Sequence, residues 1–286
     1  MRTLDLEALH IFRTVAEQGG ITRAAAKLNR VQSNVTTRVK QLEERLGTAL
    51  FTRQGRKLAL SAEGRLLLAY ADALLRLSAE AQAAVASRRP QGVFKLGTLE
   101  STAAARLPPV LARYHLANPD VQIELVTGTS GALVSRLHAF EIEAAFVAEP
   151  FNGDGLETLH VFDEELVLIS PRGADAVKAP GDIQGRAVIA FPAGCSYRRR
   201  LEEWLGRDRA GPNRVMEFAS YHAIVACVSA GAGIAVVPRS VLQLAGRAHV
   251  HAVALPARIA RARTMLAWRA GHRSILLDAL RAHLAP

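Results

Sequence analysis

Residues 31–47, VQSNVTTRVKQLEERLG, decide the fold of the N-terminal part of the chain. The first half of this stretch contains mostly weak helix formers, which are β-branched or hydrogen-bond to their own backbone, whereas KQLEERL is strongly helical. Val35, Val39, Leu42 and Leu46 recur at offsets of four, three and four, so they share one face of a helix. The spacing predicts an amphipathic helix with short hydrogen-bonding side chains at its exposed start.

Two further helices are expected before this stretch. Apolar residues between Leu6 and Ala16 recur at helical spacing, Gly19 stops that helix, and Thr22 is expected to cap a short second helix. A short helix, a tight turn and a helix that begins with Gln, Ser, Asn and Thr have the layout of a helix-turn-helix that reads the DNA major groove. The alternative is that the polar face is merely solvated.

A small hairpin is predicted directly after the third helix. Residues 51–53 and 57–60 flank Gln54-Gly55-Arg56, which places a glycine in the turn. Arg53, Arg56 and Lys57 on such a wing can reach phosphates, which position a protein without specifying sequence. Residues 1–60 are therefore predicted to form a winged helix-turn-helix.

The charge of the chain also favours a polyanionic partner. The formal net charge is +10 and the sequence pI is near 10.4, and residues 1–60 hold eleven Lys or Arg against five Asp or Glu. Charge alone indicates loose attraction to anions and does not define a fold. Its concentration in the region of the predicted helix-turn-helix points to double-stranded DNA.

Other classes of protein lack support in the sequence. Two cysteines give no disulfide framework, the histidines do not group as metal ligands, and the N-terminus lacks the form of a signal peptide. The longest uncharged run, residues 218–238, is interrupted by Ser, His and Gly, which argues against a membrane span. No phosphate loop, nucleophile elbow or catalytic carboxylate pair is evident, so we expect a cytoplasmic chain without enzymatic activity, metal or cofactor.

A long helix is predicted over residues 61–89, with Ser61 as its cap. Side chains spaced by four and three form a seam, which favours a linker that pairs two copies of the chain. The alternative is one helix packed on its own domain. The seam comprises Leu67, Ala71, Leu74, Ser78, Ala81 and Val85.

From residue 90 onward the sequence alternates between strand and helix patterns, which favours an α/β fold with a parallel sheet. A second such unit begins near residue 162, and the C-terminal stretch is expected to return to the first. This predicts two lobes, with lobe I at about residues 90–161 plus 265–286 and lobe II at about residues 162–264. Two lobes joined by crossing strands would enclose a cleft.

The chain resembles a LysR-type transcriptional regulator along essentially its whole length. The motifs that carry the resemblance are AAAKLNRVQSNVTTRVKQLEERLG at residues 24–47, LFTR at 50–53 and LALSAEG at 58–64. The sequences QSNVT and GCSYRRRLEEWL are similar to a subgroup that includes YofA-like regulators. The sequence departs from the family pattern at Thr37, where an arginine is frequent.

The resemblance implies a homodimer or homotetramer on promoter or operator DNA, regulated by a small-molecule effector in a periplasmic-binding-protein-like domain. It implies that Gln32, Ser33 and Thr36 face bases and that Arg53 on the wing enters or skirts the minor groove. Thr37 lies beside them but carries over no known contact. On charge and position, Lys40 and Arg56 are expected to contact phosphates; the DNA-facing set is Gln32, Ser33, Thr36, Thr37, Lys40, Arg53 and Arg56.

Three polar loops after strands are candidates for the effector site. Ser101 and Thr102 open a helix, Cys195 and Ser196 open another, and Thr129 lies in the third loop. Hydroxyls and free backbone N–H groups at helix starts can bind anions, so the expected ligand is a small carboxylate or a similar anion. The alternative is that these residues only cap their helices.

Two further hypotheses remain open. Cys195 lies at a helix start, where a thiol pKa can be lowered, so the chain could be a redox-sensing regulator. A solute-binding protein of the transport class would account for the two lobes alone and would require export.

Overall fold

A computed structural model describes residues 4–54, 57–86, 89–173, 177, 179–183, 185–206, 215–246 and 249–284. The chain divides into two compact units. The N-terminal unit is Met1–Arg89 with Ala139–Glu141, and the C-terminal unit is Pro90–His138 with Ile142–Pro286.

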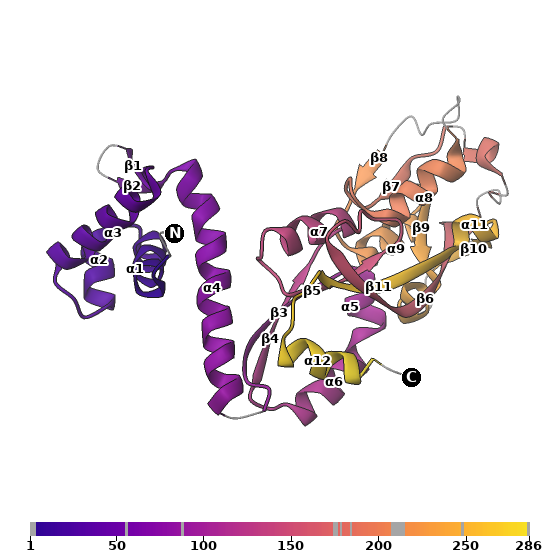
Figure 1. The fold of residues 1–286 in the computed structure, drawn as a ribbon. Helices are drawn as coiled ribbons and strands as arrows, with labels where there is room; N and C mark the ends of the chain where they lie inside the picture. The colour runs from indigo at the N-terminus through magenta and orange to yellow at the C-terminus, as the bar shows by residue number, and fades with distance from the viewer. Residues whose placement is uncertain are drawn as a thin grey trace. The chain divides into compact units, whose positions relative to one another are not determined.

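The N-terminal unit contains the three predicted helices, the hairpin and the long helix in the expected order (Figure 1). The elements are α1 (Leu6–Gln18), α2 (Ile21–Lys27), α3 (Gln32–Leu46), β1 (Phe51–Gln54), β2 (Lys57–Leu60) and α4 (Ala62–Ala86).

Local signals set the ends of the first three helices. Asp5 caps α1, where its Oδ1 accepts from the backbone N–H of Glu7 at 3.1 Å. Asn29 has a φ of 52° in the turn before α3, a conformation that asparagine tolerates better than most residues. The expected Thr22 cap is wrong, because α2 begins two residues earlier than that cap requires and its N-cap, Gly20, offers no side chain.

The predicted inner face of α3 is buried at three of its four positions. Val35, Val39 and Leu42 lie in the core of the N-terminal unit. Leu46, by contrast, is 39% exposed, because it is the last residue of α3 and the chain turns at Gly47 with a φ of 71°. Burial of the other three side chains holds the weakly helical start of α3 in place.

The hairpin is fixed to α3 by Glu43. Strands β1 and β2 pair antiparallel, and Phe51 lies opposite Leu60. Glu43 Oε1 accepts from the backbone N–H groups of Leu50 at 2.8 Å and Phe51 at 3.3 Å. The position of the wing therefore depends on a carboxylate of α3. The turn residues Gly55 and Arg56 lie outside the described part of the chain.

Helix α4 begins as predicted, with Ser61 as its cap. Ser61 Oγ accepts from the backbone N–H of Gly64 at 2.8 Å and donates to the carbonyl of Ala49 at 2.8 Å. A Cβ on Gly64 would lie 2.1 Å from the carbonyl oxygen of Leu50. Only glycine permits this close approach of α4 to the residue before the wing.

The seam predicted along α4 is partly wrong. Ala71 is fully buried and Leu67 is half-buried, and both pack in the core of the N-terminal unit with Leu9 and Phe12 of α1. The first half of the seam thus packs on its own domain, as the alternative of a single helix packed on its domain requires. The side chain of Val85 lies outside the described residues. Leu74 of the predicted seam is 37% exposed, and it continues an exposed apolar stripe with fractions of 62% at Leu66, 46% at Tyr70 and 52% at Leu77.

The C-terminal unit is the mixed α/β domain that the sequence predicts. Its first half contains β3 (Gly92–Thr98), α5 (Glu100–Ala105), α6 (Leu107–Ala117), β4 (Val121–Thr127), α7 (Ser130–His138), β5 (Ala144–Ala148) and β6 (Leu156–Pro171). Its second half contains a 3-10 turn (Pro180–Ile183), β7 (Val188–Ala190), α8 (Ser196–Leu205), β8 (Val215–Glu217), α9 (Tyr221–Ser229), β9 (Ala235–Pro238), α10 (Arg239–Leu244), β10 (Val250–Ala254), α11 (Ala257–Ala260), β11 (Arg261–Arg269) and α12 (Ile275–Ala282).

One sheet runs through both lobes in the order β10-β6-β11-β5-β3-β4, with β9 also paired to β6. Strands β4, β3 and β5 are parallel, whereas the long strands β6 and β11 run antiparallel to each other. Their pairing is irregular between Thr264 and Met265, at the middle of β11. In lobe II, β7 and β8 form a separate parallel pair.

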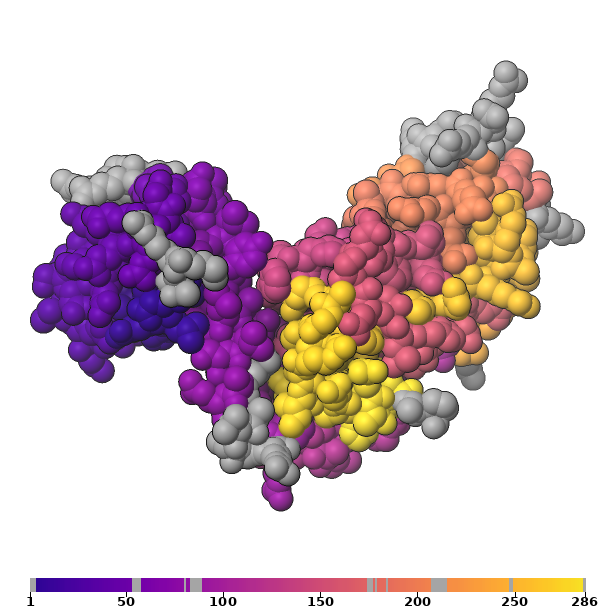
Figure 2. Space-filling model, in the orientation of Figure 1, coloured from indigo at the N-terminus to yellow at the C-terminus, as the bar shows by residue number. Residues whose placement is uncertain are grey.

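Helices cover both faces of the lobe I sheet. Ala144 and Phe146 of β5 contact a core shared with α6 and α12, and Ala145 and Val147 contact a core that includes α7. This alternation follows from the two-residue period of a strand. In Figure 2 the C-terminal segment, in yellow, covers part of the magenta segment that includes α6.

Candidate functional site

The residues of α3 predicted to face DNA lie in the first nine positions of that helix. Gln32, Ser33, Thr37 and Lys40 are exposed, and Thr36 is half-buried. The Thr36 hydroxyl donates to the carbonyl of Gln32 at 2.9 Å, so its lone pairs stay available as acceptors. The side chain of Arg53 and the whole of Arg56 lie outside the described residues.

Cations near this surface differ in how far they are neutralised. Arg30 and Arg38 both pair with Glu7, the latter at 3.8 Å. Lys40, in contrast, has no ion-pair or hydrogen-bond partner within the described ranges. Its ammonium group is therefore free to approach a phosphate.

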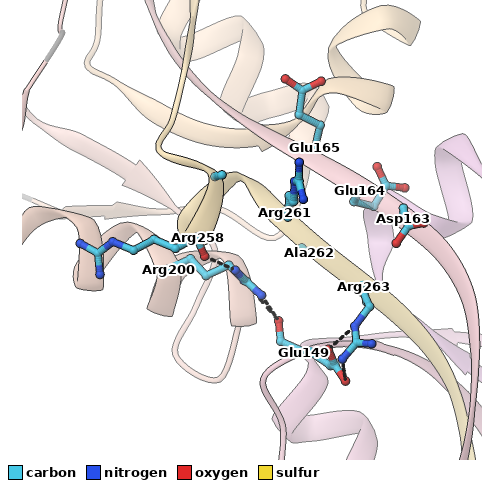
Figure 3. Close-up of a pocket in the computed structure, with 10 residues that line it drawn as sticks. Glu149, Asp163, Glu164, Glu165, Arg200, Arg258, Arg261, Ala262 and Arg263 are labelled. Carbon is cyan, nitrogen blue, oxygen red and sulfur yellow. Dashed lines mark hydrogen bonds and ion pairs between the residues drawn. The ribbon is translucent and has the colours of Figure 1, made fainter.

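One concavity of the C-terminal unit is an open groove along the crossing strands β6 and β11 (Figure 3). It has a volume of about 970 Å³. The lining residues are Glu149, Asp163, Glu164, Glu165, Arg200, Ala257, Arg258, Arg261, Ala262 and Arg263.

Most charged groups in this groove already have partners. Arg263 binds the carboxylate of Glu149 through two hydrogen bonds of 2.9 and 3.2 Å. Arg200 of α8 donates to the backbone carbonyls of Glu149 at 3.2 Å and Arg258 at 3.1 Å, as the dashed lines in Figure 3 mark. The groove is thus crossed by ionic and hydrogen-bonded ties between β5, α8 and β11, which brace the two lobes.

A second, smaller concavity lies where the starts of four helices meet, namely α5, α7, α8 and α9. It is lined by Leu99, Glu100, Ser101, Gly128, Thr129, Ser130, Ala148, Phe191, Cys195, Ser196, Tyr197 and Tyr221. Four predicted effector residues, Ser101, Thr129, Cys195 and Ser196, are among them. Thr102 is not, because it follows Ser101 on α5 and successive helical residues point about 100° apart.

The cavity is nearly closed. Its volume is about 10 Å³, roughly the room that one water molecule needs. Ser196 Oγ lies 2.6 Å from the carbonyl of Ala148 and 3.0 Å from Ser130 Oγ, and the N–H of Gly131 donates to the carbonyl of Gly194 at 3.3 Å. These bonds join α8 of lobe II to lobe I, so Ser196 serves to hold the lobes together.

Among the lining residues that sequence reasoning missed are three aromatic side chains and one carboxylate. Phe191, Tyr197 and Tyr221 supply aromatic rings, and Glu100 supplies a carboxylate. Burial raises the pKa of Glu100 above its ordinary value, although a hydrogen bond from the backbone N–H of Tyr221 opposes the shift. The position of Glu100 directly before Ser101 was the one available signal for its inclusion.

Cys195 has the opposite character from the one expected of a redox sensor. Its side chain is buried, and burial raises the pKa of its thiol. Reactive cysteines are exposed thiols with lowered pKa values. The second cysteine, Cys227, is half-buried on α9.

Within the part of the chain that the structure describes, no three His, Cys, Asp or Glu side chains are grouped as metal ligands. Among the same residues, no helix is both long and apolar enough to cross a membrane.

A winged helix-turn-helix joined to a two-lobed α/β domain defines the class of ligand-regulated DNA-binding proteins. Residues 6–65 match the bacterial regulatory helix-turn-helix family of the LysR type, and residues 87–286 match the LysR substrate binding domain. The chain belongs to the LysR family of transcriptional regulators.

Individual relatives agree with this assignment. The chain is 36% identical over 254 residues to the HTH-type transcriptional regulator GltR of Bacillus subtilis, covering 87% of this chain and 86% of GltR. Its fold is similar to full-length OxyR from Pseudomonas aeruginosa, with a TM-score of 0.72, 21% identity, and coverage of 98% and 96% of the two chains. It is also similar to full-length CbnR complexed with its target DNA, with a TM-score of 0.69, 22% identity, and coverage of 98% and 99%. The protein is therefore a DNA-binding transcriptional regulator with an effector-binding domain.

Proposed function

We propose that this regulator binds its operator through the start of α3 and changes its activity when a small molecule occupies the cavity lined by Ser101, Thr129, Cys195 and Ser196. The observation that carries this proposal is that four residues from three separate loops line one enclosed space between the two lobes. Enclosed spaces with a few polar groups are the usual sites for small ligands. Operator binding implies action in the cytoplasm, where bacterial DNA lies.

On α3, Gln32, Ser33 and Thr36 are proposed to contact bases and Lys40 a phosphate. Short polar side chains allow close approach of a helix to base edges, and Gln, Ser and Thr can bond to them. Footprinting on DNA that flanks the gene should reveal a protected site, with log affinity falling linearly as log salt rises. Binding without any sequence preference at moderate salt would contradict the proposal.

The two predicted serines of the cavity should have different effects. The hydroxyl of Ser101 is buried without a hydrogen-bond partner, whereas that of Ser196 is held between Ala148 and Ser130. Ser101→Ala should weaken an effector found by ligand screening about tenfold, because it removes a hydrogen bond to the ligand. Ser196→Ala should lower the melting temperature of the ligand-free protein, because it removes hydrogen bonds that hold the lobes together. If the effector affinity is unchanged in both variants, the effector does not bind in this cavity.

Self-association is proposed to use the exposed stripe of α4. Leu66, Tyr70, Leu74 and Leu77 leave apolar surface uncovered at helical spacing. Leu74→Glu should weaken the dimer at least tenfold in sedimentation velocity experiments, because it places a charge in the apolar contact. Ala79→Glu, at an exposed position about 180° around the same helix from Tyr70, is the control; a dimer that resists Leu74→Glu would exclude this surface.

The redox alternative is disfavoured by the raised pKa and burial of Cys195. Cys195→Ser should change neither the affinity for operator DNA nor the effect of peroxide on that affinity. Loss of a peroxide response in that variant would restore the thiol hypothesis.

A further inference from the structure

The cavity has an unexpected charge. Its lining contains one carboxylate, Glu100, and no lysine, arginine or histidine. An anionic ligand would depend on helix N–H groups, but at the start of α7 Gly131 N–H already donates to Gly194 and Ala132 N–H to Thr129 Oγ1. These two N–H groups of α7 are thus not free for an anion, and the one charged side chain in the lining is negative.

Glu100 is a half-buried carboxylate, with a side chain that is 21% exposed, and its hydrogen bonds are weak. One oxygen, Oε1, accepts long bonds from Tyr221 N–H at 3.3 Å and Ser220 Oγ at 3.5 Å, and His222 Nδ1 lies 3.9 Å away. The other oxygen, Oε2, is buried and has no partner. Burying a carboxylate without strong hydrogen bonds is costly, which explains the raised pKa of this group.

Two hydroxyls in the cavity lining make no well-aligned hydrogen bond. Ser101 and Tyr197 are each 3% exposed, and their hydroxyls lie near each other without meeting the geometry of a hydrogen bond. Buried polar atoms without a good partner are rare in folded proteins, and those that line a cavity are suited to receive a ligand. A ligand N–H group can supply the donor that Glu100 Oε2 lacks, and the neighbouring Ser101 hydroxyl can accept a second N–H bond.

Three aromatic rings complete the lining. The ring centroids of Phe191 and Tyr221 lie 4.4 Å apart, and those of Tyr197 and Tyr221 lie 6.4 Å apart. Aromatic rings attract ammonium groups through their quadrupole, most strongly where water is excluded. The combination of a carboxylate, free acceptors and aromatic rings matches the chemistry of a protonated amine.

We propose that the effector carries a protonated amino group that binds the free oxygen of Glu100 within the aromatic wall of Phe191, Tyr197 and Tyr221. This inference rests on the proposed function of the cavity and replaces the expected anion with a cation. The ammonium group donates a charge-assisted hydrogen bond to Glu100 Oε2 and further bonds to the hydroxyls. Because the closed cavity has room for about one water, the ligand enters only when the lobes separate.

Glu100 also connects ligand binding to lobe movement. It lies at the start of α5 in lobe I, and its present partners, Ser220 and Tyr221, lie at the start of α9 in lobe II. A ligand ammonium that competes for this carboxylate changes a contact between the lobes. The effector signal would thus begin at the interlobe hydrogen bonds of Glu100.

The test uses the full chain and two probes of the same size and opposite charge, n-propylammonium chloride and sodium propionate, at matched ionic strength. Binding is measured by saturation-transfer NMR and calorimetric titration. The expected result is that n-propylammonium binds in preference to propionate and that Glu100→Gln weakens its binding about tenfold, because the charge is lost while the shape is kept. Glu124→Gln, which removes an exposed carboxylate of β4, should have no effect on binding.

A third variant, Ser101→Val, separates the two proposals by filling the cavity. Propionate binding that is unaffected by Glu100→Gln and lost in Ser101→Val would overturn the ammonium inference and leave the cavity as the effector site. Binding of either probe that survives Ser101→Val would place the site outside the cavity and contradict both proposals. Failure of n-propylammonium to bind the folded wild-type chain would also overturn the inference.

Discussion

The surface of α3 and the cavity of the C-terminal unit expose their functional groups in opposite ways. On α3 the candidate residues Ser33, Thr37 and Lys40 are exposed, whereas Ser101 and Ser196 are each 3% exposed. The difference follows from the partner. DNA is large and can be met by an outward helix face, but a small ligand must be enclosed to bury enough of its surface. The candidate functional side chains are therefore exposed polar groups in the N-terminal unit and buried polar groups in the C-terminal unit.

The largest predicted effect tests whether the two units are stable independently. Gly64→Ala would bring a Cβ to 2.1 Å from the carbonyl oxygen of Leu50. We expect about 3 kcal/mol of destabilisation in the N-terminal unit, because the contact is with backbone that cannot easily move. Calorimetry of the full chain should show a lower melting temperature for this unit alone, together with loss of operator binding.

Gly20→Ala provides the matched control, since a Cβ there meets nothing within 4 Å. It should lower the stability of the N-terminal unit only slightly. An equal shift of both thermal transitions in Gly64→Ala would show that the two units unfold together and are not independently stable.

A smaller effect should separate base contacts from phosphate contacts on α3. Lys40→Ala should weaken binding to operator and random DNA alike and reduce the slope of log affinity against log salt by about 0.9. Ser33→Ala should cost about 1 kcal/mol on the operator and leave random DNA unaffected. Fluorescence anisotropy over a salt series measures both effects.

The same charge change in the other unit is the control for this experiment. Lys95→Ala removes a cation that pairs with Glu124 at 3.8 Å on the lobe I sheet. It should leave the salt slope unchanged. A slope reduced equally by Lys95→Ala and Lys40→Ala would mean that overall charge, and not the α3 surface, governs binding.

The smallest predicted effect concerns the pH dependence of the C-terminal unit. Burial raises the pKa of Glu100 in the folded protein above its ordinary value of 4.5. A carboxyl of this kind favours the folded state while protonated, so its contribution is present below pH 4.5 and is lost as pH rises through the raised pKa. Glu100→Gln should therefore match the wild type under acid conditions and be more stable at neutral pH by about 1 kcal/mol.

Urea unfolding followed at several pH values measures this difference. The groups that face Glu100 are Tyr221, Ser220 and His222. His222→Gln in the Glu100→Gln background removes the imidazole next to this site and so isolates the contribution of the carboxylate. Equal stability of wild type and Glu100→Gln across the range would show that the buried carboxylate has no net cost.

Much of the N-terminal unit could be predicted because its signals are local. The period of Val35, Val39 and Leu42 determines which face of α3 is buried, and Ser61 marks the start of α4. The error at Thr22 arose because a two-residue shift of a short helix moves the N-cap position to Gly20. The seam on α4 was misplaced because spacing shows which residues share a face, but not which neighbour covers that face.

The cavity was only half predictable. Loops after strands in an α/β fold gather at one edge, so Ser101, Thr129, Cys195 and Ser196 could be expected to meet. The charge of the site could not be predicted in the same way. Glu100 and Tyr221 come from different lobes, and no local pattern indicates that they face each other.

The sequence by itself determined the helix-turn-helix, the linker helix and the two-lobed α/β class, because hydrophobic period, caps and turn residues act over a few positions. Only the tertiary structure decided that Ala71 faces its own domain, that Ser196 holds the lobes together, and that Glu100 lines the cavity beside aromatic rings. Those properties depend on contacts between residues far apart in the chain. Burial and electrostatic environment arise only when such segments pack together.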